Sequence, residues 1–137
     1  MCDLWRVVPR ACTLAGMGNP RTVIVYADDD DLVRNVVTQA LIEEGIDVHE
    51  CASGSEAVAL CRQIVPDAVL LDLNMPDVDG LAAARELRGD PVTRSLRLVA
   101  LTGRATAGLR TKAADAGFDE CLVKPIPAAE LAEALRK

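Results

Sequence analysis

Short apolar runs alternate with amphipathic stretches along most of the chain. The run TVIVYA at residues 22–27 is apolar and β-branched, which is typical of a strand buried on both faces of a sheet. The stretch at residues 30–45 has apolar positions at helical spacing, and it reaches Gly45, a residue favoured just after a helix. A second strand-like run, DAVLLDL at residues 67–73, leads directly into polar residues. This pattern predicts strands and helices in alternation.

The same pattern extends to the end of the chain. Ser55 is the predicted N-cap of the second helix, and Pro127 lies near the first turn of the last one. The predicted strands cover residues 22–27, 46–52, 67–73, 96–102 and 120–124, and the predicted helices cover residues 30–45, 55–64, 80–89, 107–117 and 127–137.

Alternating strands and helices favour a parallel sheet that is covered by helices on both faces. Right-handed crossovers leave few topologies for such a sheet. We therefore expect a flavodoxin-like, doubly wound α/β fold, with five parallel strands in the order 2-1-3-4-5 and five helices. Ligand sites in such folds lie at the carboxyl ends of the strands, where the strand order reverses.

The first 21 residues do not share this pattern, because their Pro and Gly residues interrupt any regular period. We interpret residues 1–21 as a loose N-terminal extension and residues 22–137 as one domain. With 137 residues, of which half are hydrophobic, the chain can bury a substantial core. Aromatic residues make up only 2% of the sequence, so that core must be aliphatic.

Charge and cysteine usage exclude several classes of function. The net charge of −6 argues against binding to nucleic acid or to anionic membranes. The five cysteines are odd in number and have no CxxC spacing, so they suit a reducing cytoplasm better than a disulfide framework or a zinc site. No apolar run approaches the length of about 20 residues that a membrane helix needs.

Polar side chains stand at the carboxyl ends of four of the predicted strands. The predicted strand order brings these four ends together at one edge of the sheet, so the side chains should line one pocket. They are Asp28 and Asp29 after the first strand, Asp72 after the third, Thr102 after the fourth, and Lys124, followed by Pro125, after the fifth.

Asp72 ends an apolar strand, and a buried carboxylate is costly unless it has a partner, a metal or a chemical role. Three carboxylates in one pocket repel one another, but a hard divalent cation such as Mg²⁺, Mn²⁺ or Ca²⁺ makes them tolerable. A lysine and a threonine at the same edge can contact phosphoryl oxygens. The set therefore predicts a phosphoryl-transfer site in which Asp72 is the nucleophile.

Four motifs carry a resemblance to a known family. VYADDDDLVR, DAVLLDLNMPDVDG, LVALTG and FDECLVKPI, in this order, resemble the receiver domain of two-component response regulators. The separations agree as well, because 102 − 72 gives 30 residues and 124 − 102 gives 22. The resemblance covers about residues 22 to 137. It implies a signalling switch that takes part in its own phosphoryl transfer and is otherwise not an enzyme.

The resemblance implies a role for each polar residue. Asp72 would accept a phosphoryl group from a phosphohistidine of a sensor histidine kinase or a phosphotransfer protein. Asp29 and the backbone carbonyl of Asn74 would bind Mg²⁺ together with Asp72, and Asp28 would act through a metal-bound water. Mn²⁺ is an alternative occupant of the same site.

The remaining positions of the family's site concern the switch. Lys124 would pair with the phosphoryl group, Thr102 would move to hydrogen-bond it, and Pro125 would follow a cis peptide bond. The family usually has Tyr or Phe three residues before the lysine, where this chain has Cys121, so the aromatic part of the switch is in doubt here. Cys121 is expected to be an ordinary core cysteine.

Two alternatives remain open near the pocket. The segment ADDDD also permits Asp29 and Asp30 as the acidic pair, although Ala27 completes the strand and favours Asp28 and Asp29. Gly103 and Arg104 are expected at the rim. Arg104 would either steer the phosphodonor or be an ordinary solvated arginine.

The last predicted helix ends with the chain, so the resemblance implies a stand-alone receiver that signals through a protein contact. The family's usual contact face is formed by the fourth helix, the fifth strand and the fifth helix. A receiver cut from a longer regulator and a pseudo-receiver that binds partners without phosphate are alternatives. An aspartyl-phosphate phosphatase is a third, but it requires a second acid where this chain has Asn74.

Overall fold

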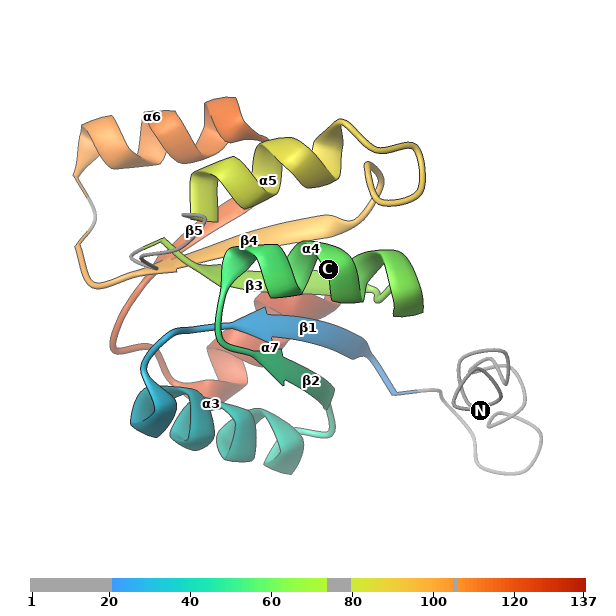
Figure 1. Cartoon of the computed structure of the whole chain (residues 1–137). Coiled ribbons are helices and arrows are strands. Elements are labelled where there is room, and N and C mark those ends of the chain that lie inside the picture. The colour runs from blue at the N-terminus through green and yellow to red at the C-terminus, as the bar shows by residue number, and fades with distance from the viewer. Residues whose placement is uncertain (1–20, 74–79, 105) are drawn as a thin grey trace.

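The computed structural model describes residues 21–73, 80–104 and 106–137 of the chain. It contains one five-stranded parallel sheet in the order β2-β1-β3-β4-β5, as predicted (Figure 1). The strands are β1 (Val23–Ala27), β2 (Asp47–Cys51), β3 (Ala68–Asp72), β4 (Arg97–Thr102) and β5 (Glu120–Val123). The helices are α3 (Asp31–Glu43), α4 (Gly54–Ile64), α5 (Gly80–Arg88), α6 (Ala107–Ala116) and α7 (Ala128–Arg136).

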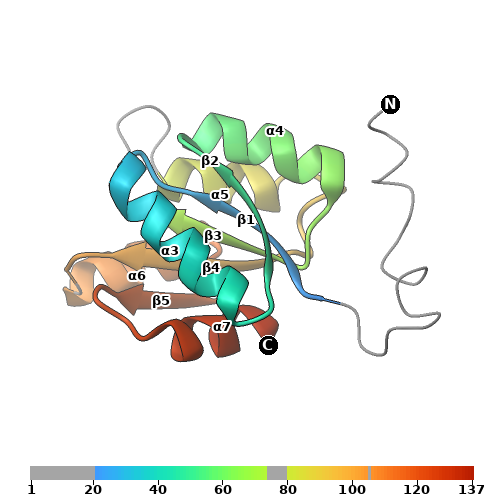
Figure 2. The same cartoon turned by 90° about the horizontal axis from the view of Figure 1, so that it is seen from below.

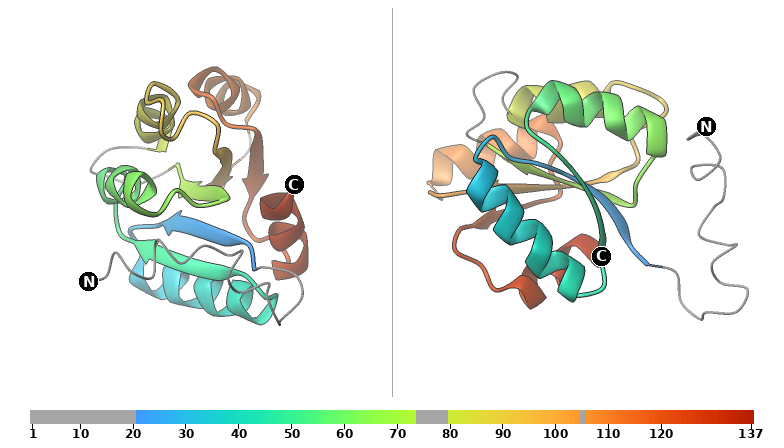
Figure 3. Two further views of the ribbon diagram at one scale, coloured as in Figure 1. Left: turned by 90° about the vertical axis from the view of Figure 1, so that its right-hand side faces the viewer. Right: turned by 60° about the horizontal axis from the view of Figure 1, so that its bottom comes forward.

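The helices cover both faces of the sheet. Helices α4, α5 and α6 lie on one face, and α3 and α7 lie on the other (Figures 1 and 2). The end-on view in Figure 3 shows the sheet as the middle of three layers. The predicted flavodoxin-like, doubly wound fold is thus confirmed.

The hydrophobic core has two halves, one on each face of the sheet. Successive side chains of a strand point to opposite faces, so Val25 and Ala27 pack beneath α4 and α5, whereas Ile24 and Tyr26 pack beneath α3 and α7. Every residue of β3 is buried, which explains why the central strands read as nearly continuous apolar runs. A fully buried leucine such as Leu70 contributes about 1.5–3 kcal/mol to stability.

Helix ends agree with the sequence signals except at one serine. The prediction of Ser55 as N-cap of the second helix is wrong, because Ser53 takes that position and its side chain accepts a hydrogen bond from the amide of Glu56 at 3.2 Å. Both serines precede the same apolar stretch, and only the extended backbone of Ser53 distinguishes them. Gly45 has a φ of 87° just after α3, as predicted.

The predicted N-terminal extension, residues 1–21, lies outside the described residues except for Arg21. Within the described ranges, no helix combines the length and the apolar character that crossing a membrane requires.

Candidate functional site

Three carboxylates meet at the carboxyl ends of β1 and β3. These two strands are hydrogen-bonded neighbours, so the residues that follow Ala27 lie beside the end of β3. One carboxylate oxygen each of Asp28, Asp29 and Asp72 lies within 4.8 Å of the other two. Asp28 is completely buried and Asp72 nearly so, whereas Asp29 is exposed. The fold therefore gathers two buried acids and one exposed acid into a single cluster.

Lys124 brings a positive charge to this cluster from the end of β5. Its Nζ lies 3.2 Å from Oδ2 of Asp72 and 3.5 Å from Oδ2 of Asp28. The backbone amide of Lys124 donates to the carbonyl of Thr102 at 2.8 Å, which fixes the lysine at the same edge of the sheet. Burial acts to lower the pKa of Lys124, but the charges and hydrogen bonds of Asp72 and Asp28 together raise it. The ammonium thus stays charged at neutral pH.

The buried Asp28 accepts hydrogen bonds on both of its carboxylate oxygens. The hydroxyl of Tyr26 donates to Oδ2 at 2.9 Å, and the amide of Asp30 donates to Oδ1 at 3.0 Å. Arg34 donates from Nη1 to the backbone carbonyl of Asp28 at 2.7 Å. Burial first, and then the charge and hydrogen bond of Asp28, raise the pKa of Tyr26 far above its ordinary value, so the hydroxyl remains a donor.

The acidic residues fit a hard divalent cation. Carboxylate oxygens are the ligands that Mg²⁺ prefers, and Mg²⁺ commonly takes one or two of them and keeps several waters. Asp30, the alternative in the acidic pair, instead caps α3 by accepting from the amides of Leu32 and Val33. This geometry favours the pair of Asp28 and Asp29. The predicted carbonyl ligand, Asn74, lies outside the described residues.

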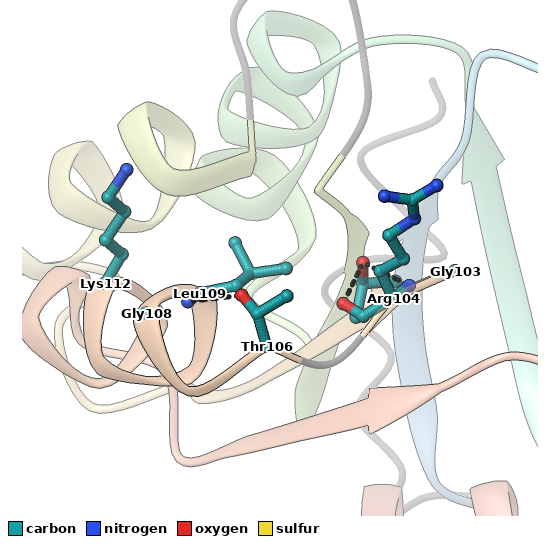
Figure 4. A pocket seen from close by; sticks show the side chains of 7 residues that line it. Gly103, Arg104, Thr106, Gly108, Leu109 and Lys112 are labelled. Atoms are coloured by element: carbon teal, nitrogen blue, oxygen red, sulfur yellow. Dashed lines mark hydrogen bonds between the residues drawn. The ribbon is translucent and has the colours of Figure 1, made fainter.

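Thr102 is buried at the end of β4 and bonds to its own loop. Its Oγ1 donates to the carbonyl of Arg104 at 3.1 Å and accepts from the amide of Arg104 at 3.2 Å. A cavity of about 560 Å³ opens beside it, with Arg104 and Lys112 on either side of Leu109 (Figure 4). Gly103 and Arg104 line this cavity, but Asp28, Asp72 and Lys124 do not, so a position of Gly103 and Arg104 at the rim of the phosphoryl pocket stays a prediction. The lining residues are Thr102, Gly103, Arg104, Thr106, Gly108, Leu109 and Lys112.

Cys121 is partly buried on β5 and packs against the core on the α6 side of the sheet. Arg110 of α6 donates to its backbone carbonyl at 3.4 Å. Burial raises the pKa of the Cys121 thiol, so it is protonated at neutral pH. The peptide bond between Lys124 and Pro125 is cis.

Sequence reasoning did not find Tyr26 or Arg34 as neighbours of the acidic cluster. Tyr26 lies within the apolar run at residues 22–27 and Arg34 within the predicted helix at residues 30–45, so neither residue was a candidate for the site. A tyrosine two residues before a buried aspartate on the same strand was the available signal, because i and i+2 share one face.

The sequence model of the response regulator receiver domain matches residues 24–136 of this chain. The chain belongs to this family, and it is a receiver domain of two-component signalling. Domains of this family act as signalling switches and interact with histidine kinases.

The curated relatives of the chain are regulators about twice as long as the matched region. Response regulator MprA of Mycobacterium tuberculosis is 36% identical over 113 residues, which cover 82% of this chain and 48% of MprA. The DNA-binding dual master transcriptional regulator RpaA of Synechocystis is 32% identical over 117 residues, which cover 85% of this chain and 48% of RpaA. The chain thus spans about half the length of the curated relatives it matches.

Solved structures have the same fold. The receiver domain of a Pseudomonas aeruginosa sensor histidine kinase is 32% identical, with a TM-score of 0.79 over 85% of this chain and 95% of that one, and it has a magnesium ion coordinated in its active-site cleft. The chemotaxis protein CheY4 of Vibrio cholerae is 24% identical, with a TM-score of 0.80 over 85% of this chain and 97% of that one. The CheY4 likeness bears on the fold alone.

Proposed function

We propose that this receiver domain is phosphorylated on Asp72 in a reaction that depends on Mg²⁺. The observation that carries the proposal is the convergence on Asp72, where the Lys124 ammonium lies 3.2 Å from its carboxylate and Asp28 and Asp29 complete an acidic cluster. Asp72 is only 4% exposed and stands at the common edge of the sheet, which supports a role for its carboxylate as the nucleophile.

The donor we propose is the phosphohistidine of a sensor histidine kinase or of a phosphotransfer protein. A carboxylate oxygen of Asp72 attacks the phosphorus atom, the phosphorus–nitrogen bond breaks, and the imidazole leaves with that electron pair. The product is an acyl phosphate on Asp72. Catalysis of such a transfer rests mainly on positioning and on neutralising the phosphoryl charge.

The proposal also names the residues that would hold the Mg²⁺ ion. Asp29 and Asp72 would supply carboxylate ligands, Asp28 would act through a water, and the family resemblance adds the backbone carbonyl of Asn74, which lies outside the described residues. When bound, Mg²⁺ neutralises part of the negative charge on the phosphoryl oxygens. Mn²⁺ is proposed as a substitute because it accepts the same oxygen ligands.

Lys124 and Thr102 form the proposed switch. Lys124 turns from the carboxylates of Asp72 and Asp28 to the new phosphoryl group, which carries more charge and more acceptor oxygens. Thr102 gives up its two contacts with Arg104 to reach the same group. Each such hydrogen bond contributes about 1 kcal/mol to stability, so exchanging the bonds to Arg104 for a bond to the phosphoryl group changes the free energy little. Arg104, beside the cavity, is proposed to meet the phosphodonor.

The proposed output is a protein contact through α6, β5 and α7, the face that corresponds to the family's usual contact surface. The described domain is proposed to bind protein and not nucleic acid, which the net charge of −6 supports. A cytoplasmic location is part of the proposal. The thiols of Cys51, Cys61 and Cys121 are free, and a reducing compartment keeps them so.

The experiment is incubation of the protein with MgCl₂ and acetyl phosphate, followed by intact-mass measurement. We expect the added mass of one phosphoryl group, lost in EDTA and lost in Asp72→Ala. No added mass with a folded protein, from acetyl phosphate and from phosphorylated histidine kinases alike, would favour a pseudo-receiver that binds its partners without phosphate.

A further inference from the structure

Tyr26 links the hydrophobic core to the acidic cluster. It is the only tyrosine of the chain, and its side chain is completely buried on the face of the sheet covered by α3 and α7. Its ring packs in the same core cluster as Leu41 and Leu131, while its hydroxyl donates to Oδ2 of Asp28 at 2.9 Å. A ring held by packing on all sides gives this hydroxyl a fixed position.

The contacts of Asp28 differ in whether they persist during the proposed reaction. Oδ1 accepts from the backbone amide of Asp30, and Oδ2 accepts from both Tyr26 and Lys124. Lys124 is 3.5 Å from that oxygen and leaves it when it turns to the phosphoryl group. The hydrogen bond from Tyr26 is then the side-chain contact that holds Oδ2 in both states.

We propose that Tyr26 is a positioning residue for the cation site, whose hydroxyl holds the carboxylate of Asp28 in the orientation that meets the hydrated cation. This inference rests on the proposed function, in which Asp28 acts through a metal-bound water. Partners that orient a metal-binding group commonly affect metal affinity by a factor of 10 or more. Tyr26 itself touches neither the cation nor the phosphoryl group.

The test compares Tyr26→Phe with wild type and with a matched control. Tyr26→Phe removes one buried hydroxyl and leaves the ring. Thr93→Val also removes one buried hydroxyl, which donates to the carbonyl of Leu87 at 2.7 Å between α5 and β4, away from the acidic cluster. Mg²⁺ affinity is measured by calorimetric titration with MgCl₂, and phosphorylation by acetyl phosphate is followed as a function of MgCl₂ concentration.

We expect Tyr26→Phe to raise the Kd for Mg²⁺ about tenfold. The half-saturating MgCl₂ concentration for phosphorylation should rise by the same factor, with an unchanged plateau rate. Thr93→Val should bind Mg²⁺ as wild type does. A Kd for Tyr26→Phe within twofold of wild type, or equal losses of affinity in both variants, would overturn the proposal.

A second measurement uses wild type alone, in case Tyr26→Phe does not fold. Because the chain has one tyrosine, an isotope label in tyrosine gives an NMR signal that reports on Tyr26 alone, without interference from Trp5. A cation next to Asp28 draws charge from the carboxylate that accepts the Tyr26 hydroxyl, so MgCl₂ should shift this signal with the same Kd as the calorimetric titration. An unshifted signal at saturating MgCl₂ would overturn the proposal. A different result would contradict the proposed function alone. In that case Mg²⁺ binding depends on Tyr26 as expected, but wild type never gains a phosphoryl group.

Discussion

The ammonium of Lys124 reaches past β4 to the carboxylate of Asp72, with Nζ and Oδ2 3.2 Å apart. The same ammonium lies 3.5 Å from Asp28, so one lysine bridges two buried acids at the ends of two neighbouring strands. The lysine side chain is 30% exposed, whereas those of Asp72 and Asp28 are 6% and 0% exposed. This unequal burial supports the proposal that Lys124 moves on phosphorylation while the two acids keep their positions.

Replacing Lys124 by Met should destabilise the protein in the absence of divalent cations. The change removes the ammonium of Lys124 and leaves the carboxylates of Asp28 and Asp72 close together. Because the lysine is partly exposed, the loss of stability should be about 1–3 kcal/mol, less than for a fully buried ion pair. MgCl₂ should restore much of this loss. The free energy of unfolding is measured in urea with and without MgCl₂, with Lys112→Met on the exposed side of α6 as the control. Equal behaviour of the two variants would contradict the prediction.

Tyr26→Phe should flatten the loss of stability at alkaline pH. The native protein holds the tyrosine proton above the pKa of 10.0 at which the unfolded chain releases it, since burial and Asp28 raise the pKa of Tyr26. The unfolded state therefore binds fewer protons there, and the free energy of unfolding falls as the pH rises past 10.0, by about 1 kcal/mol per pH unit. Lys124, whose pKa is also raised, adds a loss in the same direction to both proteins. Urea unfolding between about pH 9 and pH 11 measures the difference. If the free energy of unfolding falls equally with pH in wild type and in Tyr26→Phe, Tyr26 does not contribute to the loss of stability.

Gly80→Ala should disturb the site through the backbone of Asp72. A Cβ at Gly80 would lie 2.8 Å from the carbonyl oxygen of Asp72 and 3.2 Å from the Cα of Leu73, and neither is the end of a flexible side chain. We expect a loss of about 1–3 kcal/mol in stability and weaker Mg²⁺ binding. The matched control is Gly108→Ala in α6, where a Cβ meets nothing within 4 Å and alanine favours the helix. The prediction is wrong if the two variants have similar Mg²⁺ affinities.

Cys121→Tyr should enlarge the change that phosphorylation causes along β5. A thiol at this partly buried position is too small to exchange places with a moving threonine side chain, whereas the family's usual aromatic residue is large enough. Amide spectra before and after phosphorylation should show larger shifts over β5 and α6 in the tyrosine variant than in wild type. Cys121→Ser, which preserves the size of the side chain, should match wild type. Equal shifts in all three proteins would contradict this account of the switch.

The fold and the gathering of the acids were predictable because both follow from chain-wide patterns. The alternation of apolar runs predicted the number of strands, and right-handed crossovers limited their order to few possibilities. The parallel topology placed the carboxyl ends of all strands at one edge. Asp28, Asp72 and Lys124 are therefore neighbours although 96 residues separate the first from the last. Local propensity was less informative where two residues of one type compete, as Ser53 and Ser55 did for the cap of α4.

The hydrogen bonds that the side chains of the site make were not predictable from the sequence. The donation from Tyr26 to Asp28 depends on the twist and register of β1 against the core, and the contacts of Thr102 with Arg104 depend on the path of one short loop. The spacing of Tyr26 and Asp28 indicates that both side chains share one face of the sheet, but it does not establish the hydrogen bond between them. The contacts of Thr102 with Arg104 leave no periodic signal in the sequence. The role of Asn74 remains a prediction of the family resemblance, since that residue lies outside the described ranges.

The most direct measurement is the location of the phosphoryl group after reaction with acetyl phosphate and MgCl₂. Borohydride reduces an acyl phosphate to an alcohol, which marks the modified aspartate for sequencing by fragment ions. Trypsin separates the candidates, because residues 22–34 carry Asp28 and Asp29 whereas residues 63–85 carry Asp72. The account predicts a mark at position 72 that EDTA prevents. A mark at Asp28 or Asp29, or no mark in a phosphorylated protein, would contradict it.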